Sequence, residues 1–216
     1  MGINTKFITA TLDMLEGIAA VHTAAFSERE PMTMSVNFTK EEMYDYFLKI
    51  IPESIDSGLT IAAVDEDTRA VAGAITCFDA FADFPHIEWT AREIDGIGRT
   101  NAFFEELEKP LNGNPAFKPG KCIRFMYIST DENNLRMGIA ENLTAAMINR
   151  SVDLGYQLII VDATNRKSAG NLEKLGFHRE NVLSYKEVEK DGIKPFANVE
   201  GECILYSMNL PGGEAK

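Results

Sequence analysis

The stretch MYISTDENNLRMGIAENL, residues 126–143, is the most informative part of the sequence. A strand-like run ends at Thr130, a polar loop follows, and a helical run begins at Gly138. Glycine lets a ligand approach the backbone closely, and the first amides of a helix point outward at the positive end of its dipole. The stretch therefore predicts an anion site suited to a pyrophosphate, with Arg136 adding a charge. An ordinary strand–helix turn is the alternative.

The segments around this stretch alternate between strand and helix patterns. Strands are expected at 7–11, 60–65, 70–81, 121–130, 156–164, 181–188 and 203–210. Helices are expected at 13–26, with Asp13 as N-cap, at 39–57, where Thr39 and Glu42 form a capping box, and at 99–109, 138–155 and 168–177. Residues 82–120 are the least regular part. This order predicts an α/β or α+β domain with a mixed sheet.

Length and composition limit the class of protein. The 216 residues predict one domain, residues 1–216, and the net charge of −12 argues against nucleic acid as a partner. No apolar run reaches membrane-spanning length, and the first ten residues lack the apolar core of a signal peptide, so we expect no membrane partner and a cytoplasmic location. Cys77, Cys122 and Cys203 are widely spaced, which indicates reduced, buried thiols rather than a disulfide or metal site.

A carboxylate is fixed at the end of the first helix. In FSEREPM, residues 26–32, Pro31 pushes Glu30 out of the helical region into an extended conformation. A buried carboxylate in such a place is suited to general-base work, because burial raises its pKa toward neutrality. A helix-end carboxylate without a function is the alternative, and Glu28, two residues earlier, is the next candidate for a base.

Two motifs resemble those of the GNAT acetyltransferase superfamily. Residues 136–140 resemble its acetyl-CoA loop, R/Q-x-x-G-x-G/A, and NRKSAGNLEKLGF, residues 165–177, is similar to the next helix of that family, which ends in Gly-Phe. The resemblance implies the GNAT fold, with a mostly antiparallel central sheet of about seven strands and helices on both faces. It implies acetyl-CoA as co-substrate, no metal, and cofactor contacts from Ile128, Ser129, Thr130, Arg136, Met137, Gly138, Ile139, Ala140, Asn165 and Ser168.

The sequence departs from this family at two positions. The first position of the loop is Leu135, and the arginine follows one residue later, at Arg136. Many members carry a tyrosine as general acid where this chain has Leu172. We expect phosphate binding to persist, because backbone amides do most of that work, and we expect Leu172 to be packed in the core.

A closer resemblance is to the insect-type arylalkylamine N-acetyltransferases. FSEREPM resembles their F-x-x-D-E-P-L stretch, with Arg29 in place of the aspartate. The resemblance implies that Glu30 is the general base and that the hydroxyls of Thr164 and Ser168 assist it. The vertebrate version of this activity uses a closely spaced histidine pair, whereas His22, His86 and His178 lie far apart in this chain. A carboxylate base is therefore favoured.

The expected activity is transfer of acetyl from acetyl-CoA to a small primary amine, an arylalkylamine such as dopamine, serotonin, tryptamine or octopamine. The protein is expected to act as a monomer or weak dimer. Two alternatives stay open. The acceptor is another amine, such as a polyamine, an amino acid or a protein terminus, or the chain is a non-catalytic acyl-CoA-binding module.

Overall fold

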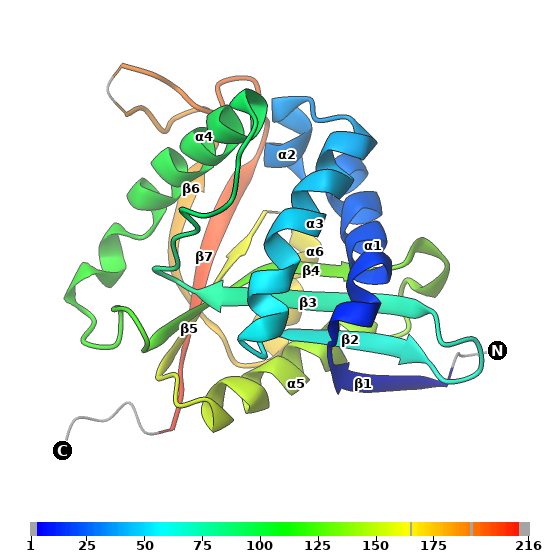
Figure 1. Cartoon of the computed structure of the whole chain (residues 1–216). Helices are drawn as coiled ribbons and strands as arrows, with labels where there is room; N and C mark the ends of the chain where they lie inside the picture. Colours follow the sequence, from blue (N-terminus) through cyan, green and yellow to red (C-terminus); the bar gives the residue numbers. More distant parts are fainter. Residues whose placement is uncertain (1–3, 165, 191, 212–216) are drawn as a thin grey trace.

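The computed structural model describes residues 4–164, 166–190 and 192–211. Within them, seven strands form one sheet in the order β1-β2-β3-β4-β5-β7-β6 (Figure 1). The strands are β1 (Thr5–Thr9), β2 (Thr60–Asp65), β3 (Val71–Asp79), β4 (Cys122–Thr130), β5 (Leu158–Ala163), β6 (His178–Ser184) and β7 (Glu202–Asn209). The β4–β5 pairing is parallel and the others are antiparallel, so the mixed, mostly antiparallel sheet expected from the sequence is confirmed.

Helices cover both faces of this sheet. They are α1 (Leu15–Arg29), α2 (Pro31–Val36), α3 (Lys40–Asp56), α4 (Ala91–Leu107), α5 (Ile139–Asp153) and α6 (Arg166–Lys174). Neighbouring residues of one strand point to opposite faces, and Ile61 and Ala62 accordingly belong to different cores. Figure 1 shows α1 and α3 crossing one face, with α6 behind the sheet. The two-sided arrangement expected from the sequence is therefore confirmed.

Three hydrophobic cores hold these layers together. The first lies under α5 and includes Ile75, Phe125, Leu143 and Leu172. The other two lie on the opposite face, one under α1 and α3, with Ile18 and Phe47, and one beside α4, with Phe103, Ile160 and Tyr185. The face that α4 covers is also the face on which Glu30 lies, since Met32 packs into the α4 core.

The sequence predicted the capping residues of one helix correctly, predicted those of a second incorrectly and missed those of a third. The capping box of Thr39 and Glu42 is confirmed at the start of α3. Asp13 is not the N-cap of α1, because it lies within a short 3-10 turn and the helix begins at Leu15 without a side-chain cap. The helix expected at 99–109 begins eight residues earlier, at Ala91, where Thr90 and Glu93 form a second capping box. The first-turn T-x-x-E signal of this helix was missed.

Candidate active site

The strands β4 and β5 part at the centre of the sheet. Their parallel pairing ends at Phe125 and Val161, although β4 continues to Thr130 along β3 and β5 continues to Ala163 along β7. Residues 126–130 therefore pair with β3 on one side, while their other edge has no β5 residue paired with it in the way that 122–125 do. Ile128, Ser129 and Thr130, the predicted cofactor residues of the strand, lie along this edge.

The loop after β4 leads directly into α5. Gly138 is the N-cap of α5 and has a φ of 76°, in the left-handed region that glycine tolerates best. No side chain caps the helix, and a Cβ built on Gly138 would meet only the Asn142 amide, 3.7 Å away. Arg136 and Met137 beside it are exposed. The amides of this 15-residue helix therefore face open space, as a pyrophosphate site requires.

Glu30 connects two helices. It is the C-terminal cap of α1 and the N-cap of α2, with Pro31 as the first residue of α2. Its Oε1 accepts a hydrogen bond from the Met32 amide at 3.1 Å, and its Oε2 accepts one from the Thr33 amide at 2.6 Å. The sequence predicted the extended backbone before Pro31, and the φ of −103° and ψ of 117° confirm it.

The carboxyl group of Glu30 is buried, with 8% of the residue exposed. Burial raises its pKa, while hydrogen bonds from Thr33, Met32 and the Thr164 side chain oppose the rise, and the pKa stays above the ordinary value. Thr164, the residue after β5, thus lies close enough to Glu30 for its side chain to lower the pKa of the carboxyl group. Glu28 is exposed and paired with Lys40, which lowers its pKa.

The remaining predicted residues lie around this pair. Ser168 and Ala169 are on α6, one turn into the helix that follows Thr164. Arg29 donates a hydrogen bond from Nη2 to the Thr130 carbonyl at 3.3 Å. It therefore ties the end of α1 to the end of β4. Asn165, a predicted cofactor residue, lies outside the described residues.

Aromatic rings line the space between α1, α3 and β4. The hydroxyls of Tyr46 and Tyr127 are 2.7 Å apart, and the ring of Tyr127 lies 5.2 Å from that of Phe26 and 5.0 Å from that of Phe47, both edge to face. Burial raises the pKa of Tyr46 to about 12 and that of Tyr127 well above its usual value. Both phenols are therefore neutral donors at pH 7, and the tyrosines were not singled out from the sequence.

His22 is a buried polar residue whose hydrogen-bond partners the sequence did not predict. It is fully buried on α1, with Nδ1 2.7 Å from the Ser129 hydroxyl and Nε2 2.9 Å from the Thr76 hydroxyl. Burial lowers its pKa to about 3, so the ring is neutral. An apolar-looking helix with one histidine gives no signal for such partners, because Thr76 and Ser129 come from β3 and β4.

Leu172 and the cysteines match what was expected of them. Leu172 is 3% exposed within the core under α5, so it is a packing residue. Cys77, Cys122 and Cys203 are buried free thiols. Burial raises the pKa of Cys122 to about 12, which leaves no thiolate at neutral pH for acyl transfer.

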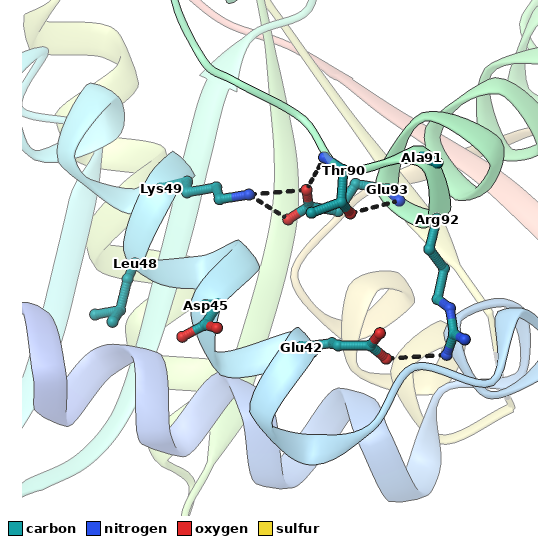
Figure 2. Close-up of a pocket in the computed structure, with 8 residues that line it drawn as sticks. All are labelled: Glu42, Asp45, Leu48, Lys49, Thr90, Ala91, Arg92 and Glu93. Atoms are coloured by element: carbon teal, nitrogen blue, oxygen red, sulfur yellow. Dashed lines mark hydrogen bonds and ion pairs between the residues drawn. The ribbon is translucent and has the colours of Figure 1, made fainter.

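A pocket of about 530 Å³ lies between α3 and the start of α4. Figure 2 shows Lys49 contacting the Glu93 carboxylate, with both oxygens within 3.0 Å, and Arg92 paired with Glu42 at 3.0 Å. Glu93 also serves the capping box of α4. These contacts fix the start of α4 against α3. They thereby help to position α4 over the face of the sheet on which Glu30 lies.

Solved structures of the same architecture are known. At a TM-score of 0.81, the chain is similar to the C-terminal condensation domain of Ebony in complex with β-alanyl-dopamine, with 16% identity over 96% of this chain and 100% of that domain. It is also similar to arylalkylamine N-acetyltransferase 2 from Aedes aegypti, at a TM-score of 0.72 and 18% identity over 95% of this chain and 99% of that one.

The chain has the GNAT fold. A third structure with it is Drosophila melanogaster polyamine N-acetyltransferase, an enzyme that forms N-acetylagmatine, at a TM-score of 0.74 and 16% identity over 96% of this chain and 100% of that one. No protein-family profile matches the sequence. Of the part of the chain that the structure describes, no helix is long and apolar enough to cross a membrane.

Proposed function

We propose that the protein is an N-acetyltransferase that moves acetyl from acetyl-CoA to a small primary amine, an arylalkylamine, with Glu30 as general base. The observation that carries the proposal is a buried carboxylate, held by two backbone amides, at the end of the helix that packs on β4. Three structurally similar proteins support the proposal. They are an arylalkylamine N-acetyltransferase, a polyamine N-acetyltransferase and a domain in complex with β-alanyl-dopamine.

The open N-terminus of α5 fits the pyrophosphate of acetyl-CoA. Gly138 to Ala140 would hold it with their amides, and the free edge of β4 from Ile128 to Thr130 would hold the pantetheine and polarise the thioester carbonyl. Acetyl-CoA supplies an activated acyl group with a thiolate leaving group. The described residues contain no group of three or more His, Cys, Asp or Glu side chains that could hold a metal ion.

Glu30 performs the proton step. An alkylamine is an ammonium ion at pH 7 and must lose a proton before its nitrogen attacks the thioester. A carboxylate attracts that ammonium, and a raised pKa makes Glu30 a better proton acceptor. Glu30 passes this first proton to solvent. The new C–N bond then forms as the C–S bond breaks, the attacking nitrogen loses its second proton to the Glu30 carboxylate, and the departing thiolate takes up a proton from solvent. Leu172 is packed away from this step, so it supplies no general acid.

The experiment is a turnover panel that measures thiol release from acetyl-CoA with dopamine, tryptamine, spermine, an amino acid and a short peptide. We expect release with the two arylalkylamines. Release only with spermine would favour the polyamine alternative. Release only with the peptide would favour a protein terminus as the acceptor. Tight CoA binding without turnover of any amine would make the chain a binding module and contradict the proposal.

A further inference from the structure

Asp162 lies at the point where the central strands part. Val161 is the last residue of β5 that pairs with β4, and Asp162 is the next residue along the chain. Ile160 belongs to the core beside α4 and Val161 to the core under α5, so the alternation of the strand places Asp162 on the α4 face. Its carboxylate is thus on the same face as Glu30, beside the site proposed for the thioester.

One oxygen of Asp162 has a partner and the other does not. Arg124 of β4 donates to Oδ2 of Asp162 and, through its other nitrogen, to Glu108 at the end of α4. The guanidinium also lies 4.9 Å from the ring centre of Phe104. The Asp162 side chain is 8% exposed, and among the described residues its buried Oδ1 has no hydrogen-bond partner.

An open oxygen on a buried carboxylate is unusual, because buried polar atoms nearly always have a partner. Thr23 Oγ1 is the other such atom in the described residues. Burying a neutral hydroxyl without a hydrogen-bond partner costs less free energy than burying a carboxylate oxygen without one. The cluster holds two carboxylates and one guanidinium. Among the described residues, the cluster therefore has more hydrogen-bond acceptors without a partner than donors.

Asp162 and Glu30 lie near the same side chains of the α4 core. Burial raises the pKa of Cys203, and the charges of Asp162 and Glu30 raise it further. The two carboxylates have the same effect on Tyr185, whose hydroxyl lies 3.4 Å from the Thr164 carbonyl. A molecule whose amine contacts Glu30 therefore has a second carboxylate nearby.

We propose that Oδ1 of Asp162 binds a hydrogen-bond donor of the acceptor that lies away from its reacting nitrogen, either a ring hydroxyl or a second basic nitrogen. This rests on the proposed function for the identity of Glu30 as the amine site. Arg124 holds Asp162 by Oδ2 and leaves Oδ1 available to such a donor. Asp162 is then the residue that selects acceptors carrying such a donor.

The test compares acceptors that differ by the donor alone, measured as binding to the CoA-loaded protein by calorimetry. Tyramine is paired with phenethylamine, and agmatine with butylamine. We expect one pair to differ by about 10- to 100-fold in affinity, the value of one hydrogen bond to a charged group. The pair that differs identifies the donor as the hydroxyl or the basic nitrogen. Because binding is measured rather than turnover, a chain that failed the turnover panel would still answer the question.

Variants then assign the preference to Asp162. Asp162→Leu should bring the discriminating ratio close to one, and Glu108→Gln, which removes a charge from the same arginine but no open oxygen, should leave it intact. A ratio of affinities within one preparation is independent of the folded fraction. If Asp162→Leu does not fold, Asp162→Asn serves as the second variant. Its amide oxygen must face Arg124, so its NH₂ group, a hydrogen-bond donor, takes the place of the Oδ1 oxygen. It should abolish a preference for a basic nitrogen and reduce one for a hydroxyl, which can turn to accept.

Two results would overturn the proposal. One is that both wild-type ratios lie within about threefold of one, a difference smaller than a charged hydrogen bond gives. The other is that a wild-type preference survives in both Asp162 variants. Turnover of arylalkylamines together with either of these two results would leave the proposed function standing and remove the role of Asp162.

Discussion

Glu30 and His22 are two buried titratable groups on one helix, and burial has opposite consequences for them. Burial favours the neutral form of both. For His22 the neutral form is the unprotonated ring, and a pKa of about 3 makes it a very weak base. For Glu30 the neutral form is the protonated acid, so a raised pKa makes its anion a stronger base. The same desolvation thus removes the histidine from acid–base chemistry and prepares the carboxylate for it.

Their hydrogen bonds differ in the same sense. His22 joins hydroxyls of Ser129 and Thr76, and Thr76 continues at 3.4 Å to Thr60, which lies 2.7 Å from Ser54. Ser54 donates to the Cys77 carbonyl, where the chain of hydrogen bonds ends. The Glu30 carboxylate instead accepts hydrogen bonds from two backbone amides of α2. The histidine is therefore a structural connection between α1, β3 and β4, while the carboxylate is held in place beside the free edge of β4.

The largest expected effect comes from removing the base. Glu30→Gln keeps the shape and one oxygen for the α2 amides, and we predict a fall in kcat of about 10²–10⁴-fold, the usual range for a general base. The affinity for CoA, measured by calorimetry, should stay the same, because Glu30 lies on the amine side. Glu28→Gln is the matched control, since it removes an exposed carboxylate from the same helix. A loss of CoA binding in Glu30→Gln would show a folding defect instead.

His22 should affect stability rather than chemistry. The folded chain keeps it neutral down to about pH 3, whereas the unfolded chain binds a proton below about pH 6.5, so acid should lower the free energy of unfolding across that window. The full loss is roughly 5 kcal/mol at most. We predict that His22→Gln unfolds more easily at pH 7 and loses less further stability on acidification, as measured by urea unfolding from pH 7 to 4.

The matched control for this experiment is His178→Gln, which replaces an exposed histidine. It should retain the wild-type acid dependence. If His22→Gln were as stable as the wild type but lost kcat by the factor expected for Glu30→Gln, the assignment of a structural role to His22 and a catalytic role to Glu30 would be contradicted.

The smallest effect concerns Thr164. Its hydroxyl lowers the pKa of Glu30, so Thr164→Ala should raise that pKa and move the acid limb of kcat/KM to higher pH. We expect the plateau to fall by less than about tenfold, because a hydroxyl only orients the base or relays a proton. Ser168→Ala should also cost less than Glu30→Gln. Ser151→Ala, which removes a buried hydroxyl within α5, should leave the limb in place.

The sequence predicted the parts of the site that local rules determine. Pro31 fixes the backbone of Glu30, and Gly138 with the following apolar stripe marks the start of α5. It did not predict the α2 helix, because six residues give no periodic pattern, nor the true start of α4. Contacts between distant strands were also beyond it. The Asp162–Arg124 pair joins residues 38 positions apart, and His22 reaches Ser129 across 107.

The central claim is that Glu30 is the proton acceptor, and the pH dependence of kcat/KM tests it most directly. Wild type and Glu30→Gln are compared with one arylalkylamine from pH 5.5 to 9.5. We predict that the wild type rises through the raised pKa of Glu30 to a plateau, while the variant lies far below at neutral pH. Its deficit should shrink toward high pH, where free amine becomes abundant. Two profiles of the same shape and similar height would contradict the account and remove Glu30 from the mechanism.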